Sequence, residues 1–390
     1  MEWFIDADAH VTESADVWTD RLPSKWAEIA PRMVRDPETR EDFWYVGGQR
    51  TSASVGATAV GGSDDWVFPD RPLNIDECPL ASWNAKARLE FLDSVGIWAQ
   101  VIYPNVGGFG NQAFMNIKDE DFRLACVQAY NDWMVQWCAE DPRRLLGVAA
   151  LPFWDVDACV KEVERCAALG FRSILFTGEP QRFTGKFFGE SHWDPLWRIA
   201  SETGLPMSLH LGSGNVEVHY NTPRFDALGI RTATAFAGVA MFLENAIQVS
   251  DLLLSGVFAR FPDLKVVSVE SGVGWLPFVL ESADRTLLNY FTTLEAANFD
   301  MLPSEYFRRN MWACYFYEKL TDTAIEAIGA DKLLFETDYP HGQCLNLTTI
   351  RQQTDSLREL PNEVRQKLLF ENAASLYHIE SPPLDKAAQG

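Results

Sequence analysis

The chain has 390 residues, of which 47% are hydrophobic and 23% are charged, and its net charge at pH 7 is -22. The hydrophobic share is ample for a folded core, and no uninterrupted apolar stretch reaches the length needed to span a bilayer. The strong negative charge would repel phosphate backbones, so nucleic-acid binding is disfavoured and a small-molecule substrate is favoured.

The N-terminus lacks a basic region followed by an apolar stretch and a small-residue cleavage site, so secretion is not expected. The seven cysteines are scattered, odd in number and never spaced as a CxxC pair. This pattern is typical of reduced thiols, and we expect a cytoplasmic protein.

Eight apolar, strand-like runs recur along the chain. They cover residues 3–10, 96–104, 145–153, 171–178, 205–211, 264–270, 311–316 and 332–338. Near-continuous apolar strands that alternate with helices are typical of a parallel sheet covered by helices. Eight such units predict an α/β fold, a closed (β/α)8 TIM barrel, which reaches this chain length as a single domain.

Helix-like segments separate these runs, judged by apolar spacing and by start and stop residues. They are expected at about 83–94, 119–140, 155–169, 193–203, 244–260, 274–290, 320–328 and 362–376. Asp155 and Gly170 mark the two ends of one helix. Asp194-Pro195 and Gly204 do the same for the next.

Three segments are too long to be ordinary loops: residues 11–82, 212–243 and 291–310. The first contains Val46-Gly47-Gly48-Gln49, a hairpin-turn signal, followed by a stretch rich in Gly and Ser at 52–63. We expect this insertion to form a cap with a mobile portion over the barrel mouth. Trp44 and Trp66 would line that mouth if the cap closes, although tryptophans are more often core residues.

Four side chains with metal-ligand chemistry fall at the ends of predicted strands: Asp8 and His10, His210, and Asp338. The period of two along a strand directs Asp8 and His10 to the same side. Strands one and eight are neighbours in a closed barrel, so the four groups meet at one mouth. Taken singly, His10 can be a buried hydrogen-bonded histidine, Asp338 a helix cap and Asp8 a solvated strand end. Their joint placement predicts one divalent ion, zinc, manganese or ferrous iron, with room for a reactive water.

The motifs around these residues resemble the amidohydrolase-related family, which includes the aminocarboxymuconate semialdehyde decarboxylase branch. They are Asp6-Ala7-Asp8-Ala9-His10, Leu209-His210-Leu211-Gly212 and Thr337-Asp338-Tyr339-Pro340-His341, and the similarity extends to a closing helix at 370–377. The resemblance implies a mononuclear barrel enzyme with these ligands. Asp8 replaces the first histidine of the common His-x-His pair, and a harder ligand favours manganese somewhat more. No lysine lies in 171–178 to form a bridging carbamate, so one metal is expected.

Glu270 stands where many relatives of this family place a catalytic histidine, and we expect it to carry a proton. The alternative is a strand-end carboxylate that pairs with an arginine. His341 is interpreted as a proton donor or substrate-binding residue, or as a partner that orients the ligand Asp338. Glu13 is either an additional ligand or, more simply, a solvated loop acid, and Glu336 is expected to be a buried partner for a basic group.

Hydrolysis by a metal-activated water is the expected reaction, with Glu270 or Asp338 accepting the proton. The alternative is non-oxidative decarboxylation of an aromatic or unsaturated acid, and a third hypothesis is a catalytically silent binding protein that keeps the metal. Three arginines in the insertions are candidates to hold a substrate carboxylate: Arg50, Arg224 and Arg231. Three further histidines are expected to be structural: His192, His219 and His378. A homo-oligomer, most simply a dimer, is expected.

Overall fold

The computed structural model describes residues 3–51, 53–63, 66, 69–214, 218–219, 221–290 and 298–383. Eight of its strands form one sheet of parallel neighbours in the order β1-β5-β6-β7-β8-β9-β10-β11. The strands are β1 (Phe4–His10), β5 (Ile97–Tyr103), β6 (Leu145–Ala150), β7 (Ser173–Leu175), β8 (Met207–His210), β9 (Val266–Val269), β10 (Met311–Tyr315) and β11 (Leu333–Phe335). Each lies inside one of the eight predicted runs, so the predicted barrel is confirmed.

The first and last strands close the barrel at the end where the chain leaves them. The amide of His10 donates to the carbonyl of Tyr339 at 2.7 Å, and the amide of Asp338 donates to the carbonyl of Asp8 at 2.9 Å. Ala9 and Tyr339 form a parallel bridge at the same place. Two of the predicted ligands, Asp8 and Asp338, are therefore joined through their backbones.

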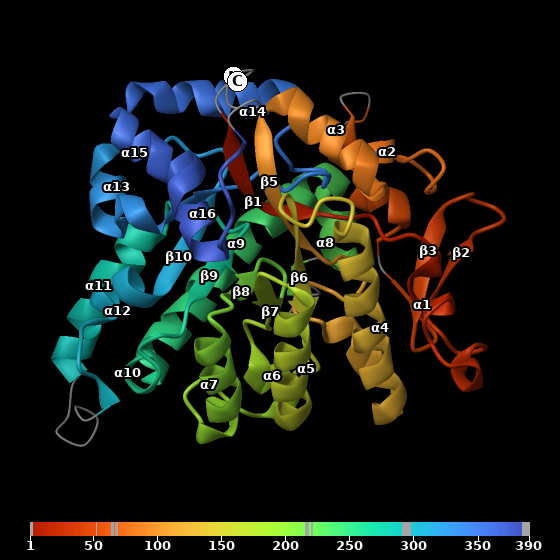
Figure 1. Cartoon of the computed structure of the whole chain (residues 1–390), viewed down its shortest axis with the longest axis horizontal. Helices are drawn as coiled ribbons and strands as arrows, with labels where there is room; N and C mark the ends of the chain where they lie inside the picture. The colour runs from red at the N-terminus through yellow and green to blue at the C-terminus, as the bar shows by residue number, and fades with distance from the viewer. Residues whose placement is uncertain are drawn as a thin grey trace.

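Helices surround the strands on all sides, as Figure 1 shows. Those that follow the strands in turn are α3 (Ala85–Val95), α4 (Glu120–Cys138), α5 (Val156–Leu169), α7 (Asp194–Thr203), α9 (Ile230–Leu254), α11 (Leu276–Tyr290) and α13 (Asp322–Ile328). The remaining helices are α1 (Asp16–Thr19), α2 (Leu80–Trp83), α6 (Pro180–Thr184), α8 (Thr222–Leu228), α10 (Val257–Arg260), α12 (Pro303–Asn310), α14 (Leu347–Ser356), α15 (Asn362–Gln366) and α16 (Asn372–Tyr377).

The predicted helix ends are confirmed for α5 and α7. The Asp155 side chain accepts hydrogen bonds from the amides of Asp157 and Ala158, and Gly170 ends α5 with a φ of 91°. Gly204 ends α7 with a φ of 69°. Both glycines adopt the left-handed conformation that a helix C-terminus commonly requires.

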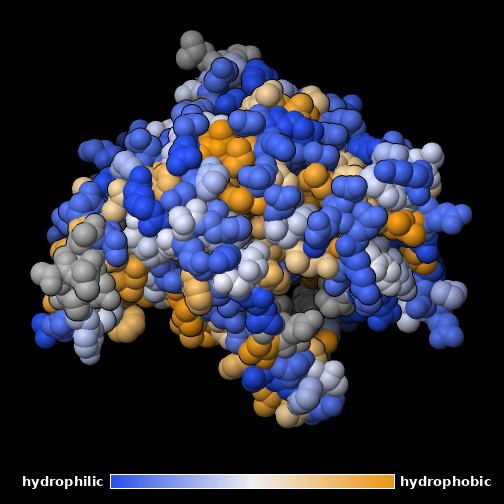
Figure 2. Space-filling view, turned by 90° about the horizontal axis from the view of Figure 1, so that it is seen from below, coloured by the Kyte–Doolittle hydropathy of each residue, from blue (hydrophilic) through white to orange (hydrophobic). Residues whose placement is uncertain are grey.

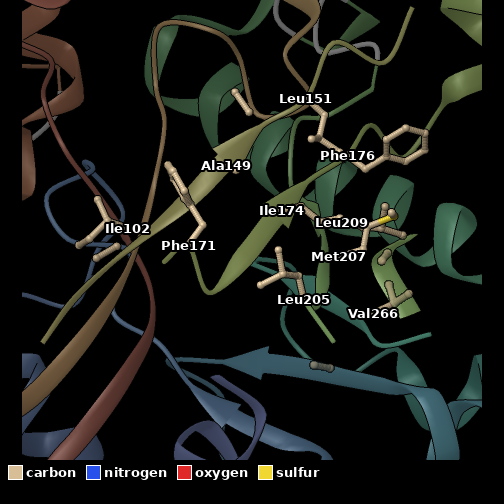
Figure 3. Packing of buried hydrophobic residues seen from close by; sticks show 14 of the residues in the cluster. Ile102, Ala149, Leu151, Phe171, Ile174, Phe176, Leu205, Met207, Leu209 and Val266 are labelled. Carbon is tan, nitrogen blue, oxygen red and sulfur yellow. The ribbon is translucent and has the colours of Figure 1, made fainter. Parts of the chain in front are cut away.

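The core has two layers, one between strands and helices and one inside the barrel. Figure 3 shows the outer layer, with Ile174 on β7, Phe176 directly after it and Met207 on the neighbouring strand β8. The inner layer includes Leu376 and Tyr377 of α16, and Trp98 at the start of β5 donates from its indole to the Glu380 carbonyl at 2.7 Å. The C-terminal segment therefore closes the barrel opposite the mouth, as expected for a closing helix.

One predicted helix boundary is wrong. The expected helix at 244–260 instead begins at Ile230, and it is divided by Ser255 and Gly256 into α9 and α10. Residues 230–243 carry apolar and helix-forming side chains directly after Gly229, so with α8 most of the supposed insertion at 212–243 is helical. Gly256, with a φ of 75°, ends the continuous helix. The insertion at 291–310 also contains a helix, α12, while 291–297 lie outside the described residues.

The insertion at 11–82 carries a small antiparallel sheet at one edge of the molecule (Figure 1). It consists of β2 (Arg32–Arg35), β3 (Asp42–Val46) and β4 (Gln49–Arg50). The predicted hairpin is confirmed, because Gly47 and Gly48 connect β3 to β4 with φ values of 58° and 79°, as a type I′ turn requires. Trp44 is buried against Trp18 and is a core residue.

Within the described part of 52–63, two short 3-10 helices lie at Val55–Thr58 and Val60–Gly62. The amide of Gly61 donates to the Pro340 carbonyl at 2.9 Å, and the Cys344 thiol contacts the Gly61 carbonyl at 3.5 Å. This stretch therefore packs on the loop that carries His341. The mobility expected for it stays a prediction, and Ser52 lies outside the described residues.

Among the described residues, α9 is the one helix long and apolar enough to cross a membrane by length and composition. Half of its most apolar window is buried inside the protein, and a single helix of this kind is weak evidence for a membrane span. Figure 2 shows another feature of the surface: on the face that it presents, hydrophobic residues form small patches among hydrophilic ones.

Candidate active site

The four predicted ligands converge at the barrel mouth. The Nε2 atoms of His10 and His210 are 3.1 Å apart, and each lies 3.5 Å from Oδ1 of Asp8. Nε2 of His10 is also 3.6 Å from Oδ1 of Asp338. All four residues are fully buried. The strand ends thus bring together two imidazole nitrogens and two carboxylates, as predicted.

The spacing of these atoms fits one divalent metal ion. Donor atoms that bind a common ion at about 2.1 Å lie roughly 3.0–3.5 Å from each other. Both carboxylate oxygens of Asp8 are buried, and neither has a hydrogen-bond partner in the described part of the chain. A buried carboxylate without partners is costly, and a cation removes that cost. Nδ1 of His210 lies 2.8 Å from the Leu211 carbonyl, an arrangement that leaves Nε2 free to bind metal.

Glu270 joins the same cluster from the end of β9. Its Oε2 atom is 3.7 Å from Nδ1 of His210. Two groups of potential ligand atoms occur here, Asp8, His10, His210 and Glu270, and His10, Glu270, Asp338 and His341. They share His10 and Glu270 and so describe one centre. The alternative partner for Glu270, an arginine, is not found among its described ion pairs.

Backbone strain is concentrated at this centre. Glu270 has a φ of 55° and Asp338 a φ of 58°, values that residues other than glycine adopt rarely. Glu270 directly follows β9 and Asp338 lies three residues after the end of β11, and both side chains belong to the cluster. Such strain persists where the surrounding structure enforces it, commonly at functional sites.

The pKa values of several acids shift because these acids are buried close together. Burial, and then the charge of Asp8, raises the pKa of Asp338 well above its usual range. Burial and the Asp338 charge raise the pKa of Glu270 in the same direction. Burial, followed by the charges of His341 and His210, lowers the pKa of His10 and keeps this imidazole neutral, as metal binding requires. For His210, burial lowers the pKa but the neighbouring Asp8 and Glu270 carboxylates outweigh it, so the pKa rises.

His341 faces the metal cluster from the loop after β11. Its ring stacks on that of His10 with centroids 3.9 Å apart, and its Nδ1 is 2.7 Å from Oδ1 of Asp338. Its Nε2 is 2.7 Å from Oδ1 of Asn105, whose amide group is oriented by a hydrogen bond to the Val11 carbonyl. The Asn105 oxygen can only accept, so Nε2 carries the proton of the neutral ring and Nδ1 faces Asp338. Burial lowers the pKa of His341 to about 4, which favours the neutral ring.

Two expectations for acidic residues are wrong. Glu13 is not a solvated loop acid: it is 2% exposed, and Oε1 accepts hydrogen bonds from the amides of Asn105 and Val106 and from the Tyr130 hydroxyl. It anchors the loop after β5, and it is absent from both groups of described ligand atoms. Glu336 has no basic partner among its described contacts. Its Oε2 accepts from the amide of Glu270 at 3.1 Å and so fixes the strained turn there.

A buried polar network supports the ligand strand from outside the barrel. Asp6 accepts hydrogen bonds from the amide and hydroxyl of Thr337 and from Gln100 at 2.7 Å. Arg88, which is fully buried, donates to Gln100 and to the carbonyl of His10 at 2.7 Å. These contacts tie together β5, β1 and the segment that carries Asp338. Burial raises the pKa of Asp6 to about 7.

Sequence reasoning missed Phe109 and Asn105, both on the loop after β5. The Phe109 ring lies 5.2 Å from His10, 4.6 Å from His210 and 5.8 Å from His341, measured between centroids. One signal was present in the sequence: Phe109 is the single large side chain in the run Gly107-Gly108-Phe109-Gly110 at a strand end.

The remaining candidates have no described contact with the cluster. Arg50 lies over the ring of Phe43 at 4.4 Å, and Arg224 lies over Phe236 at 3.9 Å. Arg231 is exposed near the start of α9. The structural role expected of the other histidines agrees with their positions: His192 packs on Trp193, His219 pairs with Glu244 at 2.8 Å, and His378 ends α16.

Barrel and site together define a metal-dependent enzyme of the (β/α)8 type. The chain belongs to the amidohydrolase family, whose model matches residues 5–379. This finding confirms the resemblance seen in the sequence motifs.

Two curated relatives align along much of the chain. This chain is 28% identical over 272 residues to the gamma-resorcylate decarboxylase of Rhizobium radiobacter. The alignment covers 65% of this chain and 76% of the relative. It is 23% identical over 372 residues to the 2-amino-3-carboxymuconate-6-semialdehyde decarboxylase of Dictyostelium discoideum, with 94% and 91% covered.

Solved structures confirm the fold. An amidohydrolase from Mycobacterium avium subsp. paratuberculosis superposes with a TM-score of 0.77 at 22% identity, covering 96% of this chain and 99% of that one. A dihydroxybenzoic acid decarboxylase from Polaromonas, solved with bound manganese and the inhibitor 2-nitroresorcinol, gives a TM-score of 0.63 at 22% identity, with 98% of each chain covered.

Proposed function

We propose that this enzyme is a manganese- or zinc-dependent decarboxylase of a small aromatic or unsaturated carboxylic acid. One observation carries the choice of reaction: the two curated relatives that align along 65% and 94% of the chain are both decarboxylases. The hydrolysis expected from the sequence has weaker support, so its alternative replaces it. Manganese is favoured by the bound ion in the Polaromonas enzyme and by the hard carboxylate of Asp8.

Asp8, His10, His210 and Asp338 would hold the ion. A bound divalent cation would supply positive charge that neutralises the substrate carboxylate and an adjacent substrate oxygen. The same charge would draw electron density from the reacting carbon. The protein must orient the acid, exclude water and deliver one proton. Decarboxylation breaks the bond between the ring carbon and the carboxylate, leaves the electron pair on the carbon and releases carbon dioxide. A proton then bonds to that carbon, and water restores the proton donor.

We assign proton delivery to Glu270. Its side chain is 9% exposed, whereas those of Asp8 and Asp338 are 0% and 1% exposed, so Glu270 is the carboxyl of the cluster that a substrate at the mouth can approach. His341, whose Nδ1 is 2.7 Å from Oδ1 of Asp338, is the reserve donor. Arg50, Arg224 and Arg231 remain candidates to bind a distant carboxylate only if the insertions close over the mouth.

A substrate screen tests this function. Metal-loaded protein would be incubated with 2,6-dihydroxybenzoate and other hydroxybenzoates, and in parallel with lactones and amides. We expect carbon dioxide from at least one hydroxybenzoate and no ring opening or amide cleavage. Hydrolysis of a lactone or amide, without carbon dioxide from any acid, would instead support the hydrolase expected from the sequence.

The segment around Gly61 is proposed as the part of the cap that shapes the site. A Cβ atom added at Gly61 would overlap the Cys344 sulfur and the His341 carbonyl, so Gly61→Ala must displace the loop that carries His341. We expect turnover to fall about tenfold while metal content stays at one ion per chain, because misplacing a catalytic group by a fraction of an ångström is costly. Gly274→Ala is the control, since its added Cβ meets nothing within 4 Å. Equal kinetics for the two variants would count against the cap.

A homodimer is proposed through α9. Phe236, Val239, Leu243 and Ile247 are 41%, 61%, 54% and 69% exposed and recur every three or four residues, which places them on one helix face. Two chains of charge -22 repel each other, and this uncharged stripe is where they can meet. We expect Ile247→Asp to halve the mass measured by light scattering, and Leu169→Asp at the end of α5 to leave it unchanged. A wild-type monomer would refute the dimer.

The cytoplasm is the proposed location. Six buried cysteines form no disulfide, which agrees with a reducing compartment: Cys78, Cys126, Cys138, Cys159, Cys166 and Cys314.

A further inference from the structure

The loop after β5 presents one aromatic ring to the metal cluster. Phe109 is partly buried, and its ring faces all three imidazoles of the centre, those of His10, His210 and His341. It is tilted by 32° to the ring of His210, which is its nearest neighbour among them. No other phenylalanine makes ring contacts with these histidines among the described residues.

This loop is held in place at both ends. At its start, Oε1 of Glu13 accepts hydrogen bonds from the amides of Asn105 and Val106 at 2.7 and 3.0 Å. At its end, the Gln112 side chain accepts from the amide of Gly110 at 2.8 Å and donates to the Gly212 carbonyl at 3.1 Å. The second of these bonds joins the loop directly to the chain that follows His210.

Close packing fixes the position of Phe109 further. A Cβ atom at Gly110 would lie 2.8 Å from the carbonyl of Ser213 and 3.1 Å from Cβ of Thr177. The backbone beside Phe109 therefore touches the loops after β7 and β8, and only glycine fits there. Such an anchored loop places the ring without a further ordering cost when substrate binds.

We propose that Phe109 determines specificity for planar aromatic acids, by packing its ring against the ring of an acid bound at the cluster. This inference rests on the proposed function and names its substrate class more closely. An aromatic face beside three imidazoles offers stacking to a flat ring and offers little to a flexible aliphatic acid. The same apolar ring keeps water away from the carbon that receives the proton.

Binding of 2-nitroresorcinol, a planar aromatic probe, tests the proposal without turnover. Calorimetry on the metal-loaded protein would compare wild type, Phe109→Ala, Phe109→Leu and Phe109→Trp, with oxalate as a ligand that has no ring. We expect the alanine variant to bind 2-nitroresorcinol at least about tenfold more weakly than wild type. The leucine variant should lose part of this affinity, and the tryptophan variant should keep it. Oxalate affinity and metal content should not change in any of them.

Phe278→Ala is the matched control, because Phe278 is 73% exposed on α11 and has no described ring contact with the histidines. The proposal is overturned if wild type does not bind 2-nitroresorcinol or if Phe109→Ala binds it as tightly as wild type does. It is also overturned if Phe109→Ala loses as much affinity for oxalate as for 2-nitroresorcinol. Failure of the proposed function is recognised separately: the probe binds through Phe109 while no hydroxybenzoate releases carbon dioxide.

Discussion

Replacing His210 with alanine is expected to remove the metal and leave the barrel folded. His210 contributes one of two imidazole nitrogens, and its Nε2 lies 3.1 Å from that of His10 and 3.5 Å from Asp8. Removing a residue that only orients a metal ligand lowers metal affinity by about 10- to 100-fold. Removing the ligand itself should therefore lower metal affinity by more than roughly a hundredfold. Turnover should fall at least as far. Metal per chain would be measured by mass spectrometry after gel filtration, and folding by circular dichroism.

The barrel should survive this change because its two core layers consist of apolar side chains. His192→Ala is the control: this histidine packs on Trp193 in a short 3-10 helix and should keep a full complement of metal. If His210→Ala retains one ion per chain with unchanged affinity, His210 is not a ligand. Equal metal loss in both variants would instead show general destabilisation.

Glu270→Gln is expected to keep the metal and lose the reaction. Glutamine preserves the size of the side chain and can still form hydrogen bonds, but it can neither give nor take the proton. General acid-base catalysis contributes roughly a hundredfold or more, so kcat should fall by that factor. Steady-state kinetics with metal content measured on the same sample would separate the effects.

Glu336→Gln is the comparison for this variant. Glu336 is a fully buried acid, and its carboxylate accepts a hydrogen bond from the Glu270 amide, which a glutamine oxygen can also do. Its loss of rate should be far smaller. A Glu270→Gln enzyme that runs at nearly the wild-type rate would move proton delivery to His341, and one that loses its metal would make Glu270 a ligand.

The barrel and the meeting of the four proposed ligands were predictable because their signals are local. Each barrel strand is a short apolar run with a helix after it, and each proposed ligand lies within three residues of the end of a strand. Asp8 and His10 share one strand, so a period of two was enough to place them together. The order of strands in a closed barrel then brought His210 and Asp338 to the same mouth.

The remaining features depend on contacts between distant segments. Glu13 looks like a loop acid until Asn105 and Val106 supply the amides that it accepts, some ninety residues along the chain. Phe109 becomes part of the site only when β8 and the loop after β11 bring two histidines to it. The start of α9 was missed for a different reason: residues 230–243 were assigned to the insertion that follows β8, although they form the first part of one continuous helix.

The proposed decarboxylation is tested most directly by carbon dioxide release from 2,6-dihydroxybenzoate labelled with carbon-13 in its carboxyl group. Manganese-loaded enzyme would be followed by mass spectrometry, then stripped with a chelator and reloaded. We expect labelled carbon dioxide and an equal amount of resorcinol with the metal present, almost none after stripping, and recovery on reloading. Release that is unaffected by the chelator, or no release from this acid or any related hydroxybenzoate while a lactone or amide is hydrolysed, would contradict it.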